Sequence, residues 1–178
     1  TSIPQDHDYA EFSDLIGWKI HNPNRHVEEL GIPVYEDVHL SLIDKYRIKK
    51  TSLYQEFQEY GHLEGGWKKL DKLDRGYASF KKARQLFDFT DMISTLINEE
   101  DKIPTFKVLI IDEAQDLSKL QWELVDKLIE RSEKVYIAGD DDQAIFRWAG
   151  ADVQELLRRA NDSSNTKSVL HQSFRIPS

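Results

Sequence analysis

Two acidic residues, Asp112 and Glu113, follow directly after an apolar run at residues 108–111. The run is continuous and mostly aliphatic, which is typical of a strand buried in a parallel sheet. Ligands of open parallel sheets bind just beyond the carboxyl ends of the strands. One carboxylate there can hold Mg²⁺, and the next can accept a proton from an attacking water. Acidic residues at strand ends often only face water, but this apolar run and the Ala-Gln-Asp that follows the pair favour a reactive site.

A second polar segment, residues 139–152, begins where another apolar run, 135–138, ends. The carboxamide of Gln143 can donate to a phosphate oxygen and accept from a water, as a sensor of a terminal phosphate would. Phe146 and Trp148 follow, in a loop before a predicted helix. Exposed rings in such a loop can stack on unpaired bases, at about 1–3 kcal/mol each. Packing into a local core is the alternative for both rings.

A third polar segment, residues 171–177, follows the last apolar run. The guanidinium of Arg175, just past a strand end, can clamp a γ-phosphate through two hydrogen bonds and stabilise developing charge. The ring of Phe174 beside it can stack on a nucleobase. Taken alone this segment is weak evidence, because Phe-Arg dipeptides are frequent.

These segments need a scaffold that brings several strand ends to one edge. The apolar runs at 107–111, 135–138 and 167–170 are predicted as strands. Residue pairs that begin helices alternate with these runs, namely Asp88 with Asp91, Ser118 with Gln121, and Asp152 with Glu155. Strands and helices that alternate with short connections predict an α/β fold with a parallel sheet.

The first part of the chain has a different pattern. Up to about residue 35 it is irregular and interrupted by prolines, and from there to residue 84 it is helical. Tyr77 and Phe80 fall on one helix face, as do Leu53 and Phe57, so we expect short amphipathic helices in this region.

The net charge of the 178 residues is -8, but it is unevenly distributed. Residues 44–84 hold 11 basic and 6 acidic residues, a net charge of +5 between two acidic flanks. Basic side chains among aromatic ones suit a surface that follows a nucleic-acid backbone and stacks on its bases. Solvated helix faces with the aromatics turned into a small core explain the pattern equally well. The residues concerned are Lys45, Arg47, Lys49, Lys50, Lys68, Lys69, Lys72, Lys81, Lys82 and Arg84, with Tyr46, Tyr54, Tyr60, Trp67 and Tyr77.

Taken together, the segments at 112–116, 139–152 and 172–175 resemble motifs II, III and IV of the UvrD/Rep-like superfamily 1 DNA helicases, in the order and at the spacing of that family. Asp88-Phe-Thr-Asp91-Met also resembles the family's Asp-Phe-x-Asp-Leu segment, where the chain returns from an inserted helical domain. The resemblance is specific over about residues 85–178.

The resemblance implies an α/β fold, a partial P-loop NTPase (RecA-like) parallel sheet with a mainly helical inserted region. Residues 1–84 would be that helical accessory region, and residues 85–170 the second half of the RecA-like ATPase domain. Residues 171–178 would start the connection to a second RecA-like domain.

The resemblance also implies a role for each nucleotide-site residue, with ATP and Mg²⁺ as ligands. Asp112 would hold the Mg²⁺, and Glu113 would be the general base for the water that attacks the γ-phosphate. Gln143 would contact that phosphate and couple its loss to DNA. Arg175 would be an arginine finger. Phe174, where the family often has Tyr, would stack on adenine.

Single-stranded DNA is the implied partner of the loop that precedes the predicted helix at 152. Phe146 and Trp148 would meet the strand, Trp148 by stacking. The family often carries Arg at the position of Ala149, so that residue receives no role here.

A phosphate-binding loop of the Gly-x-x-x-x-Gly-Lys-Ser/Thr type does not occur, since none of the eight glycines is followed by lysine. That loop supplies the cradle, the lysine and the Mg²⁺-binding hydroxyl for the triphosphate. We therefore expect no useful ATP turnover from these 178 residues alone. The missing Walker A segment and a second RecA-like domain, both of the same protein, would be further partners.

Two other functions stay open beside an ATP-dependent DNA helicase or translocase. A non-catalytic module that kept the fold would bind DNA without any response to ATP. A metal-dependent nuclease or phosphatase, built from Asp112, Glu113, Asp116 and Asp140, would hydrolyse without ATP, but it leaves the amide and the arginine without a role.

Composition excludes several other classes. The chain has no cysteine, which excludes disulfides and thiolate metal sites. Its apolar runs are too short to cross a bilayer, and no basic-then-apolar leader opens the sequence. We expect a cytoplasmic protein with no membrane partner.

Overall fold

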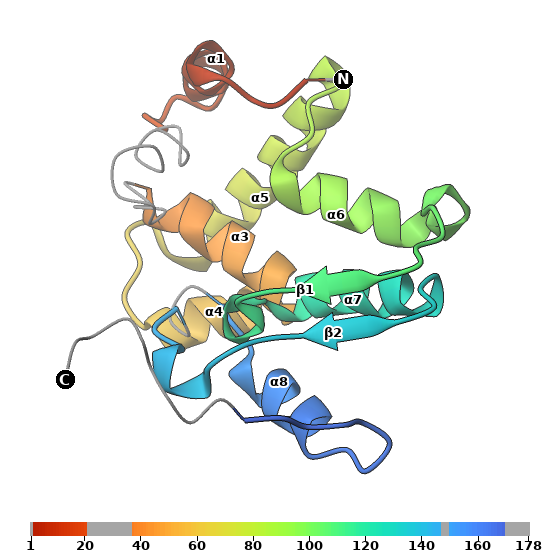
Figure 1. The fold of residues 1–178 in the computed structure, drawn as a ribbon. Helices are drawn as coiled ribbons and strands as arrows, with labels where there is room; N and C mark the ends of the chain where they lie inside the picture. Colours follow the sequence, from red (N-terminus) through yellow and green to blue (C-terminus); the bar gives the residue numbers. More distant parts are fainter. Residues whose placement is uncertain (1, 21–36, 147–149, 170–178) are drawn as a thin grey trace, which may run out of the picture.

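The computed structural model describes residues 2–20, 37–146 and 150–169 (Figure 1). Helices dominate these residues, which also form one small parallel sheet of two strands in the second half of the chain. The elements are α1 (Asp6–Ile16), α3 (Val38–Lys49), α4 (Leu53–Tyr60), α5 (Gly66–Arg84), α6 (Phe89–Asn98), the 3-10 turn η1 (Glu100–Lys102), β1 (Leu109–Ile111), η2 (Ala114–Asp116), α7 (Lys119–Glu130), β2 (Val135–Ile137), η3 (Asp141–Gln143) and α8 (Val153–Ala160).

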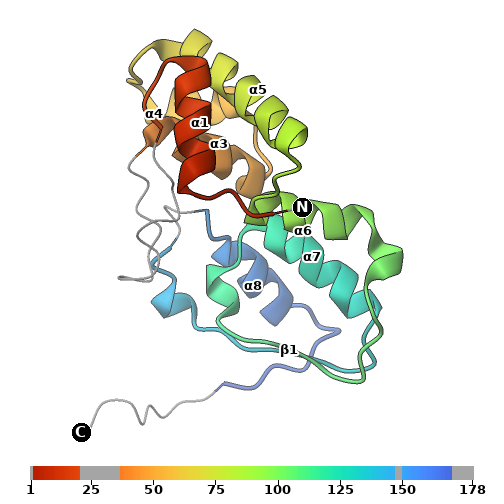
Figure 2. The same ribbon diagram turned by 90° about the horizontal axis from the view of Figure 1, so that it is seen from above.

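Helices α1, α3, α4 and α5 form one half of the molecule and share a hydrophobic core (Figure 2). Helix α5 supplies its centre, because Leu70 and Leu73 are only 0% and 1% exposed and lie three residues apart. Tyr77 and Phe80 continue the same face and are buried, as their spacing predicted. The helix ends at Gln85, whose φ of 56° is left-handed and stops the helical repeat.

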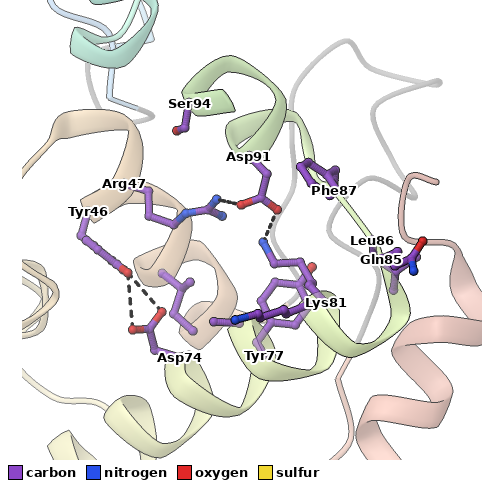
Figure 3. A pocket seen from close by; sticks show the side chains of 13 residues that line it. Tyr46, Arg47, Asp74, Tyr77, Lys81, Gln85, Leu86, Phe87, Asp91 and Ser94 are labelled. Carbon is purple, nitrogen blue, oxygen red and sulfur yellow. Dashed lines mark hydrogen bonds and ion pairs between the residues drawn. The ribbon is translucent and has the colours of Figure 1, made fainter. Parts of the chain in front are cut away.

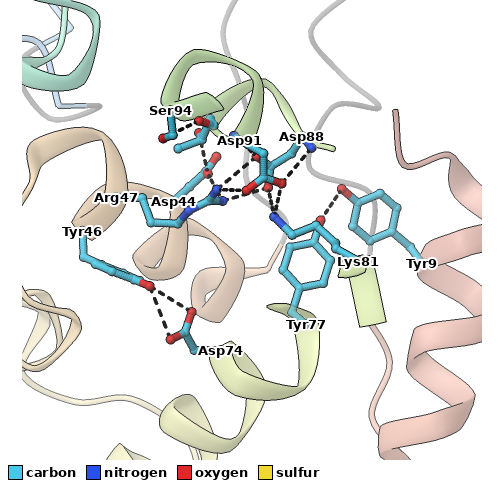
Figure 4. Close-up of polar contacts among 11 residues, drawn as sticks. Tyr9, Asp44, Tyr46, Arg47, Asp74, Tyr77, Lys81, Asp88, Asp91 and Ser94 are labelled. Carbon is cyan, nitrogen blue, oxygen red and sulfur yellow. Dashed lines mark hydrogen bonds and ion pairs between the residues drawn. The ribbon is translucent and has the colours of Figure 1, made fainter. Parts of the chain in front are cut away.

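A cluster of largely buried charges joins this helical half to α6 (Figure 4). Arg47 of α3 and Lys81 of α5 both bond to Asp88 and Asp91, which begin α6. The two aspartates also form the predicted capping box, each side chain accepting from the backbone N–H of the other. The Asp-Phe-Thr-Asp segment is therefore a structural junction: it begins a helix and fixes that helix to two others.

The sheet forms the other half, together with α7 and α8. Strands β1 and β2 are parallel, with Leu109, Ile110 and Ile111 level with Val135, Tyr136 and Ile137. Ile111 and Ile137 point to one face, where they pack against the core of α7 and α8. Helix α7 begins at the predicted capping box, in which Ser118 and Gln121 bond reciprocally. Two predicted strands and the crossover helix between them are thus confirmed.

The prediction that these strands are buried on both faces is wrong for the part of the chain that the structure describes. Ile110 and Tyr136 point away from α7 and α8 and are 70% and 59% exposed. Val108, on the same face as Ile110, is 48% exposed. No described element covers this face of the sheet, so the continuous apolar run has one buried and one open side.

Two further expectations need correction. Residues 167–169 were expected to begin a third strand, but they form none, and no backbone hydrogen bond joins them to β1 or β2 in the described structure. A strand persists only where its N–H and C=O groups find a partner. Asp152 precedes α8 without capping it, because its side chain accepts no backbone N–H there. Glu155 instead bonds to Arg158 and Arg159 of its own helix.

None of the described helices is both long enough and apolar enough to span a membrane.

Candidate functional site

The carboxyl ends of β1 and β2 lie side by side and carry the residues that the sequence singled out. Ala138 N–H donates to Ile111 C=O at 2.8 Å, and Ala114 N–H donates to Ala138 C=O at 3.0 Å. The loop after β1, with Asp112 and Glu113, is therefore hydrogen-bonded to the chain leaving β2. Both polar segments reach one edge of the sheet, as parallel strands require.

Glu113 is held in an unusual backbone conformation at this edge. Its φ of 51° and ψ of 40° are left-handed, which costs a non-glycine residue about 1–2 kcal/mol. The turn carries Ala114 into the core, where it is fully buried, and leaves the side chains of Asp112 and Glu113 exposed. Strain that turns two carboxylates toward solvent at a strand end is typical of functional sites.

Gln115 connects the two loops, and its role was not predicted from the sequence. Its side chain is only 2% exposed. The amide nitrogen Nε2 donates to Glu113 Oε2 at 2.7 Å, and the carbonyl Oε1 accepts from the backbone N–H of Asp140 at 2.9 Å. Gly139 fits against it only because it lacks a side chain, since a Cβ there would lie 2.9 Å from Gln115 Oε1 and 2.8 Å from Leu156 Cδ2. The signal in the sequence was only its position, directly after Asp112, Glu113 and Ala114 in the predicted strand-end loop.

Gln143 belongs to the same network. Asp140 begins the η3 turn and accepts from the backbone N–H of Asp142 at 3.1 Å. Its other carboxylate oxygen accepts from Gln143 Nε2 at 2.5 Å. A chain of hydrogen bonds thus runs from Glu113 through Gln115 and Asp140 to Gln143, and all but Gln115 are exposed.

The few carboxylates at this edge suit Mg²⁺, which needs few protein ligands, better than a metal whose ligands all come from the protein. Asp112 is exposed, and its Oδ1 accepts only from the backbone N–H of Glu113, at 2.9 Å. Mg²⁺ usually binds one or two carboxylates and completes its shell with waters and substrate phosphates. Among the described residues, no group of three or more His, Cys, Asp or Glu is arranged to hold a metal. The nuclease alternative, which needs four carboxylates around metal ions, therefore gains no support.

Asp116 differs from its neighbours in this segment. Its Oδ1 is buried and has no hydrogen-bond partner in the described part of the chain. Burial raises the pKa of Asp116, and the nearby charge of Glu113 raises it further.

The remaining predicted site residues divide into two sets. Phe146 lies between η3 and α8 and is half-buried, with its carbonyl accepting from Ala151 N–H at 3.3 Å. Trp148, Phe174 and Arg175 lie outside the described residues, so their predicted contacts stay predictions.

Six of the eleven cations in the basic stretch are paired within the chain, among them Arg75, which pairs with Asp71. Arg47 and Lys81 join the buried cluster, Lys49 pairs with Glu56 at 2.5 Å, Lys50 pairs with Glu123, and Arg84 pairs with Glu11. Lys45, Lys68, Lys69, Lys72 and Lys82 make no ion pair with any described residue. The net charge of +5 therefore overstates the positive surface that the stretch can present.

The aromatic residues of the stretch also divide. Tyr77 is buried and its hydroxyl lies 3.1 Å from that of Tyr9, as the core alternative predicted. Burial raises the pKa of Tyr9 to about 12. Tyr54 and Tyr60 are 49% and 48% exposed, and Tyr54 meets the ring of Trp67 edge to face. A surface with rings and unpaired lysines is thus left on α4 and the start of α5.

A cavity of about 450 Å³ lies elsewhere, between α3, α5 and α6 (Figure 3). Arg47, Lys81 and Asp91 of the charge cluster form one wall, and Tyr46, which bonds to Asp74 at 3.3 Å, forms another. Burial raises the pKa of Asp74, although the hydrogen bond from Tyr46 opposes this. The cavity contains none of the residues that the sequence singled out at the strand ends.

Known proteins match this chain over most of its length. The model of the UvrD/REP helicase N-terminal domain matches residues 9–164. ATP-dependent DNA helicase PcrA of Bacillus subtilis is 33% identical over 132 residues, which are 67% of this chain and 18% of that protein. The PcrA helicases of Staphylococcus epidermidis and Staphylococcus aureus are 33% and 32% identical over 110 and 109 residues, 57% and 56% of this chain and 15% of each relative.

The chain therefore spans less than a fifth of the length of these curated relatives. The family model, in contrast, covers all of the described helices and strands except the first three residues of α1. A match over that much of the sequence establishes the relationship for the chain itself. The chain belongs to the UvrD/REP helicase N-terminal domain family.

Proposed function

We propose that this chain is the part of an ATP-dependent DNA helicase or translocase that carries the carboxylates for ATP hydrolysis. The observation that carries the proposal is that the loops after two adjacent parallel strands are linked by hydrogen bonds, and these loops carry Asp112, Glu113 and Gln143. The names of the PcrA relatives, ATP-dependent DNA helicases, support the same activity.

Each residue at this edge has a role that its surroundings allow. Asp112 would hold Mg²⁺, which when bound neutralises charge on the triphosphate. Glu113, exposed and fixed by Gln115, would accept the proton of the attacking water. Gln143 would exchange its bond to Asp140 for one to the γ-phosphate, and so couple phosphate loss to the loop that carries Phe146.

Three roles rest on the resemblance, since their residues lie outside the described part of the chain. Trp148 would stack on single-stranded DNA, Arg175 would stabilise the transferred phosphate, and Phe174 would stack on adenine. The division into a helical accessory region at 1–84, an ATPase half-domain at 85–170 and a connection at 171–178 is part of the same proposal.

The open face of the sheet supports a larger assembly. Val108, Ile110 and Tyr136 expose apolar surface that a parallel sheet normally buries under a second layer. A RecA-like domain would supply that layer from the segment that also carries the phosphate-binding loop. Without this loop the triphosphate is not positioned, so the 178 residues alone would not turn over ATP.

The test is ATP hydrolysis by the whole protein that contains this chain, with and without single-stranded DNA, beside a Glu113→Gln variant. DNA-stimulated turnover that collapses in the variant supports the motor and the role of Glu113 together. DNA binding without turnover in the unaltered protein would instead favour the non-catalytic DNA-binding module.

A further inference from the structure

The buried amide of Gln115 makes two hydrogen bonds of opposite kind. The carboxylate oxygen Oε2 of Glu113 is an acceptor, so Nε2 of Gln115 is the donor at 2.7 Å. The backbone N–H of Asp140 can only donate, so Oε1 must be the acceptor at 2.9 Å. Chemistry alone fixes which way this amide points, and the one side chain supplies both groups at once.

The surroundings keep the amide in place. Gln115 is 2% exposed, and its neighbour Ala114 is fully buried and bonded to the strand-end carbonyl of Ala138. Gly139 closes the other side, since any side chain there would collide with Gln115 and Leu156. Each of the two bonds has one buried end at Gln115, so water competes less for it than for a bond on the open surface.

We infer that Gln115 is a positioning residue that fixes the candidate base and ties it to the phosphate-sensing loop. Its donor bond orients the exposed carboxylate of Glu113. Its acceptor bond fixes the backbone at Asp140, whose side chain holds Gln143 at 2.5 Å. When Gln143 moves toward a phosphate, a shift of Asp140 is therefore passed to Glu113 through the buried side chain of Gln115. The inference rests on the proposed function for its catalytic meaning, but the link between the loops is a property of the chain itself.

Two variants separate the two bonds. Gln115→Met keeps the length and apolar packing of the side chain and removes both. Gln115→Glu keeps the acceptor for Asp140 but, when measured at about pH 9 where the new acid is ionised, replaces the donor bond to Glu113 with repulsion between two carboxylates. Gln55 provides matched controls, because its Nε2 also donates to a glutamate, Glu59 Oε1 at 2.9 Å, but on the exposed side of α4.

The first measurement is amide hydrogen exchange of residues 138–143 in the whole protein without nucleotide. Gln115→Met is expected to speed exchange in this segment at least about tenfold, since the Asp140 N–H loses its buried acceptor. Gln115→Glu and Gln55→Met should leave it within about twofold. Unchanged exchange in Gln115→Met would overturn the link between the loops.

The second measurement is steady-state ATP hydrolysis with single-stranded DNA. Both Gln115 variants are expected to lower kcat about 10- to 100-fold with KM for ATP within about twofold, because orientation of the base matters in the reaction and little in binding. Gln55→Glu should change neither. A kcat within twofold in Gln115→Glu would overturn the positioning role, and that variant also decides the matter if Gln115→Met fails to fold. If the unaltered protein shows no turnover, the proposed function fails, while the exchange measurement still tests the link.

Discussion

Two pairs of acidic residues in this chain have opposite surroundings. Asp88 and Asp91, at the start of α6, accept hydrogen bonds from Arg47 and Lys81 and from each other's backbone, and both are largely buried (Figure 4). Asp112 and Glu113, at the end of β1, are exposed, and no cation among the described residues pairs with them. The first pair uses its hydrogen-bonding capacity inside the protein. The carboxylates of the second pair leave most of their hydrogen-bonding capacity open to a ligand or to water.

The charges around the two pairs also differ, since in the described part of the chain cations surround the first pair and not the second. Burial by itself would raise the pKa of Asp88, but the hydrogen bonds and charges of Arg47 and Lys81 outweigh it and hold the pKa at about 2. Asp88 is thus ionised because the fold surrounds it with cations. Such a carboxylate stabilises a junction, whereas an exposed strand-end carboxylate without a cation can bind a metal or take up a proton. The sequence presents both pairs in recognisable motifs, and only the surroundings separate the structural pair from the candidate catalytic one.

The largest expected effect comes from removing the candidate base. Glu113→Gln should lower DNA-stimulated ATP turnover about 10²- to 10⁴-fold, because a general base contributes that much to the rate. The unfolding midpoint should stay within about 2 °C, since the side chain is exposed. Turnover assays and thermal unfolding of the whole protein measure both. A variant that lost stability as well as turnover would show that Glu113, like Asp88, has a structural role, which contradicts the difference drawn between the two pairs.

The next effect is on stability, at the buried pair. Lys81→Met should lower the free energy of unfolding by about 3 kcal/mol, since it leaves two largely buried carboxylates with Arg47 as their remaining strong cation. Lys102→Met is the matched control: its ammonium also pairs with a carboxylate, Glu99 at 2.7 Å, but is 63% exposed, and the cost should be about 0.5 kcal/mol or less. Denaturant unfolding compares the two. Equal losses would show that burial does not distinguish them.

The pH dependence of unfolding should report the same cluster. Because the pKa of Asp88 is lowered from 3.8 to about 2 on folding, the folded state binds fewer protons than the unfolded state between these values. Asp88 therefore contributes its stability above about pH 4, and about 2 kcal/mol should be lost as the pH falls from there to about 2. Unfolding curves in that range should lose this slope in Asp88→Asn. Persistence of the full slope would assign it to other carboxylates.

The smallest expected effect concerns the cations outside the cluster. Replacing Lys68, Lys69 and Lys72 together with Ala should reduce the salt dependence of single-stranded DNA binding. The slope of log affinity against log salt should become shallower by about 0.7 for each phosphate that these lysines neutralise. Lys69 and Lys72 lie over the ring of Trp18, at 5.0 and 5.6 Å, so their charges are available without an ion partner. Lys50→Ala should leave the slope unchanged, because Glu123 already pairs with that lysine. An unchanged slope in the triple variant would show that these lysines of α5 do not bind the DNA backbone.

Local signals in the sequence predicted the pieces of this fold well. Ser118 with Gln121 and Asp88 with Asp91 begin helices where the capping pattern placed them, since a capping box needs only residues within one turn. The apolar runs before Asp112 and Gly139 became adjacent parallel strands. The same kind of signal failed at Asp152, because Glu155 bonds to arginines of α8 and no capping box forms. It also failed at 167–169, because a strand needs a partner strand that the local sequence does not supply.

The residues at the strand ends were found from sequence because each motif is contiguous. Gln115 was missed because its two partners, Glu113 and Asp140, are 2 and 25 positions away, and nothing in the sequence says that they meet. The net charge of the basic stretch overstates its positive surface for the same reason, since Lys81 and Arg47 count as positive until the fold brings Asp88 and Asp91 against them.

By itself, then, the sequence determined the chemistry available to this protein: two carboxylates and an amide after apolar strands, no cysteine, and no phosphate-binding loop in these residues. The tertiary structure alone decided which charges are neutralised, which face of the sheet stays open at Ile110 and Tyr136, and which buried amide joins the two loops. The physical reason is the distance along the chain over which each interaction acts. Capping, periodicity and strand propensity act within a few residues, whereas ion pairing, burial and hydrogen bonding between loops depend on groups far apart in the chain.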